Sequence, residues 1–203
     1  MRIGVIACEI FKEEIDNMIS GDQDIAHLEY LELALHNEPE RLREEIITKA
    51  NSLKGKVDAL LLGYCYCQAL EGVLNDIDIP AEMIHTDDCI GVFLTPERYE
   101  EERSKCPGTW FNSPGWTKEG VEGAIKELKL DMIADKMDPK ELLLMMFDGY
   151  SRCLFIDTGA GDVSHLLGLS HSFAEEMNLR HEETVGGYKM LEEAFGKVKR
   201  LSR

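Results

Sequence analysis

A chain of 203 residues with 44% hydrophobic residues is long enough to bury one sizeable core, so a single domain is the first expectation. Lys and Arg number 22 against 39 for Asp and Glu, and the net charge of -17 repels the phosphates of nucleic acids and acidic membrane surfaces. We therefore expect no nucleic acid and no membrane as a partner.

The N-terminal segment and the apolar stretches do not predict export. The N-terminal segment has one basic residue, Arg2, and then too few apolar residues before Glu9 for the core of a signal peptide. The strongest apolar stretch, residues 142–147, ends at Asp148 and is too short to span a membrane. We expect a cytoplasmic protein, in which the six cysteines serve as reduced thiols, ligands or nucleophiles and do not form disulfides.

Strand-like runs rich in Ile, Val and Leu alternate along the chain with amphipathic stretches of helical length. In chain order, the expected elements are a strand at 3–7, a helix at 9–19, a strand at 27–33, a helix at 39–53, a strand at 57–63, a short helix at 67–74, a strand through 83–84, a helix from 89 to the break at 106, a strand at 109–112, helices at 119–130 and 139–147, a strand at 152–156, and helices at 163–177 and 188–195.

This alternation predicts an α/β fold with a mostly parallel open sheet and helices on both faces, of the Rossmann-like, doubly wound type. Residues 57–63 form the clearest strand, and their uninterrupted apolar run predicts an interior position covered on both faces. No long repeat and no Pro- or Ser-rich linker interrupts the pattern. Residues 1–203 are therefore expected to form a single domain.

Three cysteines share one structural position. Cys8, Cys67 and Cys89 each follow an expected strand and precede an expected helix. In an open parallel sheet the carboxyl ends of the strands meet at one edge, where such folds bind their ligands. The positive ends of helices also favour the thiolate form that metals bind. Because thiolates that meet repel one another unless a cation neutralises them, the pattern predicts a metal site formed by these three residues.

Alternatives remain for the individual cysteines. Any one of them is also explained as a small buried hydrophobic residue. Cys65 is either a fourth ligand or a bystander, and His85 is the other candidate for a fourth ligand. Cys106 and Cys153 lie away from such junctions and are expected to serve in packing. Since the chain has no CxxC pair, a zinc ribbon and a thioredoxin-like redox motif have no support.

The ligand set leaves the identity of the metal open. Three protein thiolates with an open position suit a catalytic Zn²⁺ ion, and they equally suit a [4Fe-4S] cluster whose fourth iron faces the substrate. Zinc is favoured by its general frequency, whereas the absence of a clear histidine or carboxylate ligand favours a cluster.

Two strand ends are candidates for binding a ligand. Asp157-Thr158-Gly159 has the letters of an aspartic-protease motif, but that chemistry needs two carboxylates in facing β lobes, so the protease is excluded. The glycine N–H groups and the Thr158 hydroxyl are instead suited to hold an anionic part of a ligand, although a plain tight turn explains them nearly as well. Gly63 and Tyr64, at the end of the clearest strand, are expected to contribute to the same cofactor-binding edge.

Both tryptophans of the chain lie within one short segment, residues 106–116. The segment is expected over the carboxyl edge of the sheet, where Trp110 and Trp116 would cover a pocket. An ordinary aromatic anchor in a loop is the alternative. No P-loop and no complete dinucleotide motif occurs, so no nucleotide cofactor is predicted.

Short motifs across the chain together resemble a known family. They are Ile6-Ala7-Cys8-Glu9, Leu35-His36 with Pro39, Leu61-Leu62-Gly63-Tyr64 leading to Cys67, Asp88-Cys89-Ile90, Pro107-Gly108-Thr109 with Pro114-Gly115-Trp116, and Ile156-Asp157-Thr158-Gly159. From about residue 3 to 195 the chain resembles an uncharacterised domain family of methanogenic archaea and anaerobic bacteria, often encoded near corrinoid-dependent methyltransferases. The resemblance implies that Cys8, Cys67 and Cys89 belong to the family pattern.

Two functions from different classes follow. The first is an enzyme of anaerobic one-carbon or methylamine metabolism linked to corrinoids, whose metal acts as a Lewis acid or activates a thiol, with His36, His85 and Asp157 as candidate catalytic groups. The second is a carrier or sensor of a metal or corrinoid without catalysis. A small molecule or a corrinoid protein is the expected partner in either case. A metal that only stabilises the fold is the third alternative.

Overall fold

The computed structural model describes residues 1–66 and 70–201, without the side chains of residues 34 and 36. All strand pairs of its two sheets are parallel, and helices flank both sheets. The predicted α/β class, with mostly parallel strands in a Rossmann-like arrangement, is confirmed. The strands are divided between two sheets, a division that the pattern of strands and helices did not predict.

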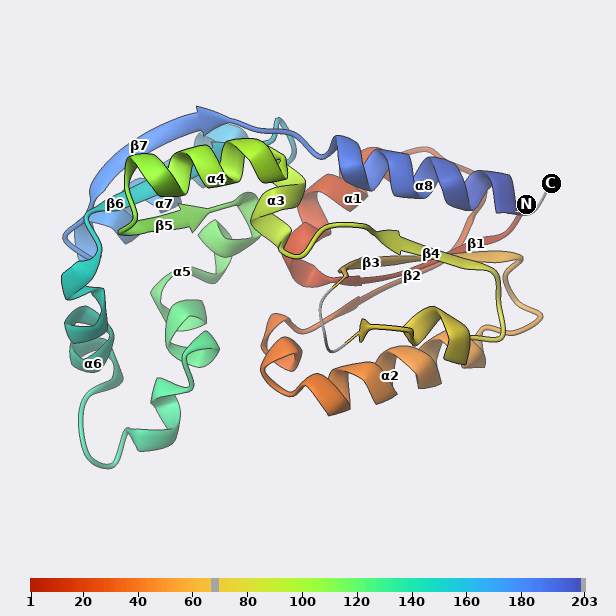
Figure 1. The fold of residues 1–203 in the computed structure, drawn as a ribbon, viewed down its shortest axis with the longest axis horizontal. Helices are drawn as coiled ribbons and strands as arrows, with labels where there is room; N and C mark the ends of the chain where they lie inside the picture. Colours follow the sequence, from red (N-terminus) through yellow and green to blue (C-terminus); the bar gives the residue numbers. More distant parts are fainter. Residues whose placement is uncertain (67–69, 202–203) are drawn as a thin grey trace. The chain divides into compact units, whose positions relative to one another are not determined.

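The chain forms two compact units (Figure 1). Unit 1 consists of Met1–Val92 and Tyr188–Arg203, and unit 2 consists of Phe93–Gly187. Each unit has its own parallel sheet. That residues 1–203 act as a single domain stays a prediction.

Unit 1 has a four-stranded sheet in the order β2-β1-β3-β4. Its elements are β1 (Ile3–Cys8), η1 (Glu9–Phe11), α1 (Lys12–Ile19), β2 (Ile25–Leu31), η2 (Leu33–Asn37), α2 (Pro39–Ser52), β3 (Ala59–Cys65), η4 (Val73–Asp76), β4 (Ala81–Ile84) and α8 (Lys189–Leu201). Helix α2 lies on one face of this sheet, and α1 and α8 lie on the other (Figure 1). Helix α3 (Cys89–Leu94) begins in unit 1 and ends in unit 2.

Strand β3 occupies the interior of this sheet. It pairs with β1 on one side and with β4 on the other, and all of its residues before Cys65 are buried. The apolar run at residues 57–63 predicted this position, and the prediction is confirmed. Parallel strands that are covered on both faces need such a run, because neither face meets water.

Unit 2 has a three-stranded sheet in the order β5-β6-β7. Its elements are α4 (Pro96–Lys105), β5 (Thr109–Asn112), α5 (Pro114–Glu127), η5 (Leu130–Ile133), α6 (Pro139–Met146), η6 (Phe147–Gly149), β6 (Arg152–Asp157), α7 (Val163–Glu176) and β7 (Arg180–Val185). Strand β7 was not predicted from the sequence. It lies at the edge of the sheet, and its first five residues are all polar, so it has no apolar run.

The two tryptophans of unit 2 pack with its aromatic core. The rings of Trp110 and Trp116 meet edge to face at 5.5 Å. Trp110 also lies 5.3 Å from the ring of Phe147 and 5.6 Å from that of Phe173, both of which belong to the buried cluster under the sheet. The structure therefore supports an aromatic anchor in place of a pocket cover.

Two of the predicted helices are divided or replaced in the structure. The helix expected from residue 89 to 106 is two helices, because Pro96 cannot continue α3 and Thr95, at a φ of 68°, caps the start of α4. Of the helix expected at 67–74, residues 67–69 lie outside the described residues, and a 3₁₀ turn, Val73–Asp76, follows.

Candidate functional site

Three cysteines of unit 1 follow neighbouring strands of its sheet. Cys8 is the last residue of β1 and is buried, whereas Cys65 is the last residue of β3 and is partly exposed. Cys89 is the first residue of α3, which follows β4, and it is also partly exposed. Cys67 lies outside the described residues. Because β1, β3 and β4 are consecutive in the sheet, these three cysteines share its carboxyl edge.

The register of the strands gives the relative heights of these residues. Ala7 of β1 is opposite Gly63 of β3, so Cys8 is level with the residue that follows Gly63. Cys65 is opposite Ile84, the last residue of β4. The loops continue this pairing, since the Tyr66 N–H donates to the Thr86 carbonyl at 2.8 Å.

Tyr64 brings a buried hydroxyl to this edge. Its side chain is 7% exposed, and its hydroxyl has no hydrogen-bond partner among residues 1–66 and 70–201. Burial and, after it, the electrostatic interaction with Cys8 raise the pKa of Tyr64, so the phenol stays protonated. The result is a proton donor with unused hydrogen-bonding capacity in the neighbourhood of Cys8.

Gly63 serves the packing of the sheet. A Cβ at this position would lie 2.4 Å from the Cβ of Ala7 and 3.1 Å from Cδ1 of Ile15. Because both neighbours are buried in the core, no room remains for a side chain. Gly63 therefore allows β1, β3 and α1 to pack closely together. The residues that follow Gly63 are the ones available to bind a ligand at this edge.

The histidines that were predicted as site residues differ in what surrounds them. His85 follows β4 and is exposed, its Nε2 atom lies 2.6 Å from the Glu82 carboxylate, and its ring stacks on that of Tyr66 at 6.1 Å. His36 lies in η2, and its side chain is outside the described part of the chain. His85 therefore has an acidic partner, Glu82, on the strand that precedes it.

Asp157 ends β6 in unit 2, and Thr158 and Gly159 follow it, on a different sheet from the cysteines of unit 1. The Gly159 N–H donates to the Asp157 carboxylate at 2.8 Å, and Gly159 has a φ of 73°. Thr158 is buried, with 8% of its surface exposed. The Asp157 carboxylate thus closes a tight turn, and the glycine supplies the left-handed conformation that this turn needs.

A group of potential metal ligands that the sequence analysis missed lies in unit 2. Within residues 1–66 and 70–201, His171, His181 and Glu183 form the one group of three or more His, Cys, Asp or Glu side chains whose ligand atoms all lie within 4.8 Å of one another. The cysteines of unit 1 do not meet that criterion among these residues. Burial, and after it the charge of His171, lowers the pKa of His181. The only sign in the sequence was the spacing of His181 and Glu183 by two residues. This spacing places both side chains on one face only if the segment is a strand, and β7 was not predicted.

A model of the family described as "Protein of unknown function (DUF1638)" matches residues 30–195. The chain belongs to the DUF1638 family. The predicted membership of an uncharacterised domain family is thereby confirmed. No curated protein and no solved structure matches the chain. The DUF1638 range includes Cys65, Cys89 and the histidine group of unit 2, and it begins after Cys8.

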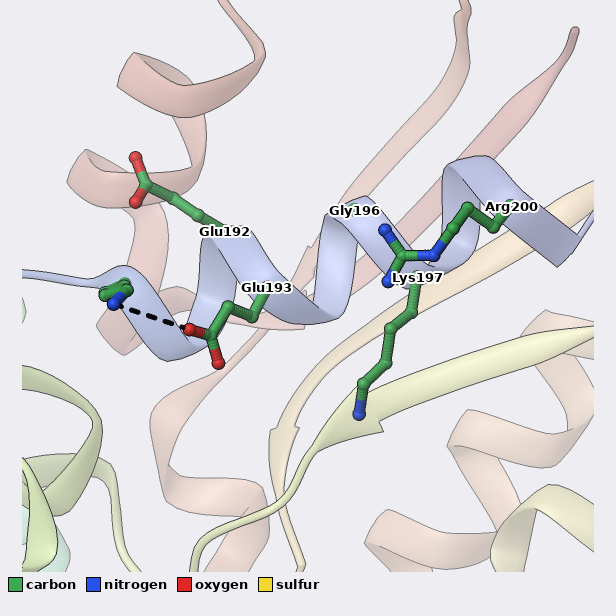
Figure 2. Close-up of a pocket in the computed structure, with 6 residues that line it drawn as sticks. Glu192, Glu193, Gly196, Lys197 and Arg200 are labelled. Atoms are coloured by element: carbon green, nitrogen blue, oxygen red, sulfur yellow. Dashed lines mark ion pairs between the residues drawn. The ribbon is translucent and has the colours of Figure 1, made fainter.

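A hollow on the surface of this DUF1638 protein lies along α8 (Figure 2). Its lining residues are Lys189, Glu192, Glu193, Gly196, Lys197 and Arg200. All belong to one helix, and Nζ of Lys189 forms an ion pair with the carboxylate of Glu193 at 3.8 Å. Because the hollow follows a single helix and mixes both signs of charge, we do not assign a ligand to it.

No helix among the described residues is long and apolar enough to cross a membrane.

Proposed function

We propose that this DUF1638 protein binds a metal through cysteine thiolates at the carboxyl edge of the sheet of unit 1, with Cys8, Cys67 and Cys89 as ligands. The observation that carries the proposal is the position of cysteines after three consecutive strands, β1, β3 and β4, of one parallel sheet. Along the sequence, Cys67 follows two residues after Cys65, which is the last residue of the middle strand, β3. Cys65 or His85 is the fourth ligand if the metal has one.

The donor set fits a metal that prefers sulfur. Zn²⁺ and iron–sulfur clusters are both bound by thiolates, whereas Mg²⁺ and Ca²⁺ require oxygen ligands. The net charge of -17 also attracts cations and repels anions at long range. A metal held by three thiolates keeps a position for a substrate, on which it would act as a Lewis acid or activate a thiol.

Tyr64 supports a site that does more than hold the fold. A buried hydroxyl without a partner among the described residues costs stability, and a functional role in binding a ligand is one explanation of such a group. The hydroxyl stays protonated in the neighbourhood of Cys8. It is therefore suited to donate a hydrogen bond to an oxygen or sulfur of a bound substrate.

We place this site in an enzyme of anaerobic one-carbon or methylamine metabolism linked to corrinoids, in the cytoplasm, where thiols stay reduced. The support is the family resemblance to proteins encoded beside corrinoid-dependent methyltransferases, together with the chemistry of thiolate-bound metals. A carrier or sensor is the second candidate, favoured by the partial exposure of Cys65 and Cys89. Methyl transfer between a corrinoid protein and a thiol, measured with and without this protein, separates the two candidates.

The test of the site itself is anaerobic purification followed by metal analysis and a visible absorption spectrum. We expect stoichiometric zinc without visible colour, or iron and sulfide with the brown absorption of a cluster. Cys8→Ser, Cys67→Ser and Cys89→Ser should each lower the metal content sharply, while Cys106→Ser, at a cysteine away from the sheet edge, should leave it unchanged. Equal metal content in all four variants would contradict the proposal.

A further inference from the structure

We propose that His171, His181 and Glu183 form a second metal site, separate from the thiolates, that binds one divalent transition-metal ion of the Zn²⁺ class and leaves a coordination position open. All three residues belong to unit 2. The proposal rests on their placement, on their distances and on the buried hydrogen bonds behind one of the rings.

The placement of the three side chains follows from the local fold. His181 and Glu183 are separated by one residue on β7, so both project from the same face of the strand. Helix α7 packs on β7 and brings His171 to that face. The three ligands thus come from two rigid elements, which hold a site more firmly than loops do.

The distances suit a single ion. The ligand atoms of the three side chains all lie within 4.8 Å of one another. Ligands at about 2.0–2.1 Å from a tetrahedral Zn²⁺ ion lie about 3.3 Å apart, so the side chains must rotate toward one another to bind one ion. The two imidazole rings stack with centroids 3.8 Å apart and an interplanar angle of 25°, which two charged rings would oppose. Metal binding requires the neutral form of both rings, in which this repulsion is absent.

Buried hydrogen bonds hold the His181 ring in place. Its Nε2 atom lies 3.0 Å from the hydroxyl of Ser170, which is fully buried. The same hydroxyl accepts a hydrogen bond of 3.0 Å from the amide of Asn112, which is also fully buried. Metal-binding histidines commonly have one ring nitrogen fixed in this way, which leaves the other nitrogen for the ion.

The donor set and its exposure indicate the class of metal. Two imidazoles and a carboxylate suit Zn²⁺ and its transition-metal neighbours, whereas Mg²⁺ and Ca²⁺ prefer oxygen ligands alone. His171 and Glu183 are exposed, so an ion enters from solvent and keeps water in its remaining position. Two histidines, one glutamate and a water are also a ligand set of hydrolytic zinc enzymes.

The probe is Zn²⁺ itself, measured by equilibrium dialysis of the full chain in reducing, anaerobic buffer. His171→Gln and Glu183→Gln should each remove one equivalent of bound Zn²⁺. Ser170→Ala should lower the affinity for that Zn²⁺ ion by about 10- to 100-fold. His165→Gln changes another exposed histidine of α7 and should leave the stoichiometry and affinity unchanged. Unchanged binding in His171→Gln and Glu183→Gln would overturn the proposal.

The two metal sites are tested independently in the same assay. In Cys8→Ser the equivalent assigned to the histidines should persist, and in His171→Gln the thiolate-bound metal should persist. If all bound Zn²⁺ disappears with the cysteine substitution, the histidine site is refuted. Circular dichroism of the metal-free variants checks that they fold, which the exposure of His171 and Glu183 leads us to expect.

Discussion

Replacing Tyr64 with phenylalanine removes a buried hydroxyl that has no hydrogen-bond partner among the described residues. A buried polar group without a partner costs about 1–3 kcal/mol, and the loss of one oxygen atom leaves little empty space. We therefore expect Tyr64→Phe to raise the free energy of unfolding of the metal-free protein by about 1 kcal/mol. The same substitution should weaken the binding of a substrate at the thiolate site, because the substrate loses the hydrogen bond from the Tyr64 hydroxyl.

Urea denaturation in the presence of a chelator measures the first effect. Tyr30→Phe is the matched control within unit 1, because the Tyr30 hydroxyl donates to the Asp16 carboxylate at 2.7 Å. Its loss should lower the free energy of unfolding by about 1 kcal/mol, so the two substitutions have opposite signs. A Tyr64→Phe protein that is less stable than the wild type would refute the reasoning, since the hydroxyl would then have a partner in the folded chain.

Three further predictions concern single residues. Cys106 should be alkylated at lower pH than Cys153, because hydrogen bonds from Ser and Thr hydroxyls lower the pKa of Cys106 while burial raises that of Cys153 to about 11; equal rates across pH would contradict this. In metal-free protein, NMR should give His181 a pKa below the ordinary range, so the contribution of His181 to stability falls as the pH drops through about 6.5. His171→Gln should raise the pKa of His181, and an unchanged pKa in this variant would contradict the prediction. Gly63→Ala should lower the free energy of unfolding by about 3 kcal/mol in chemical denaturation, because its Cβ would be 2.4 Å from another, and near-wild-type stability would contradict this.

The fold class followed from the sequence because its evidence is local. Apolar runs such as residues 57–63 and the amphipathic stretches between them are readable without knowing which strands pair. The division into two sheets depends on contacts between strands, which no single segment encodes. Strand β7 was not predicted for a different reason. Four of its six residues are charged or histidine, and its position at the edge of the sheet requires no apolar run.

The candidate sites divide in the same way. The positions of Cys8 and Cys89 beside strand ends were predictable, because strand and helix boundaries are local features. Whether their sulfurs converge with that of Cys67 depends on the loop after β3 and stays a prediction. The histidine site combines a helix with an unpredicted strand, so no spacing along the chain indicated that His171 would meet His181.

X-ray absorption at the metal edge tests the central claim most directly, because it identifies the atoms that bind the metal. The sample is anaerobically purified His171→Gln protein, in which the histidine site is removed and the thiolate site is intact. We predict sulfur ligands at about 2.3 Å from the metal, numbering three or more. A first shell of only nitrogen and oxygen at about 2.0–2.1 Å, or a protein without metal, would contradict the claim that this sheet edge is a thiolate metal site.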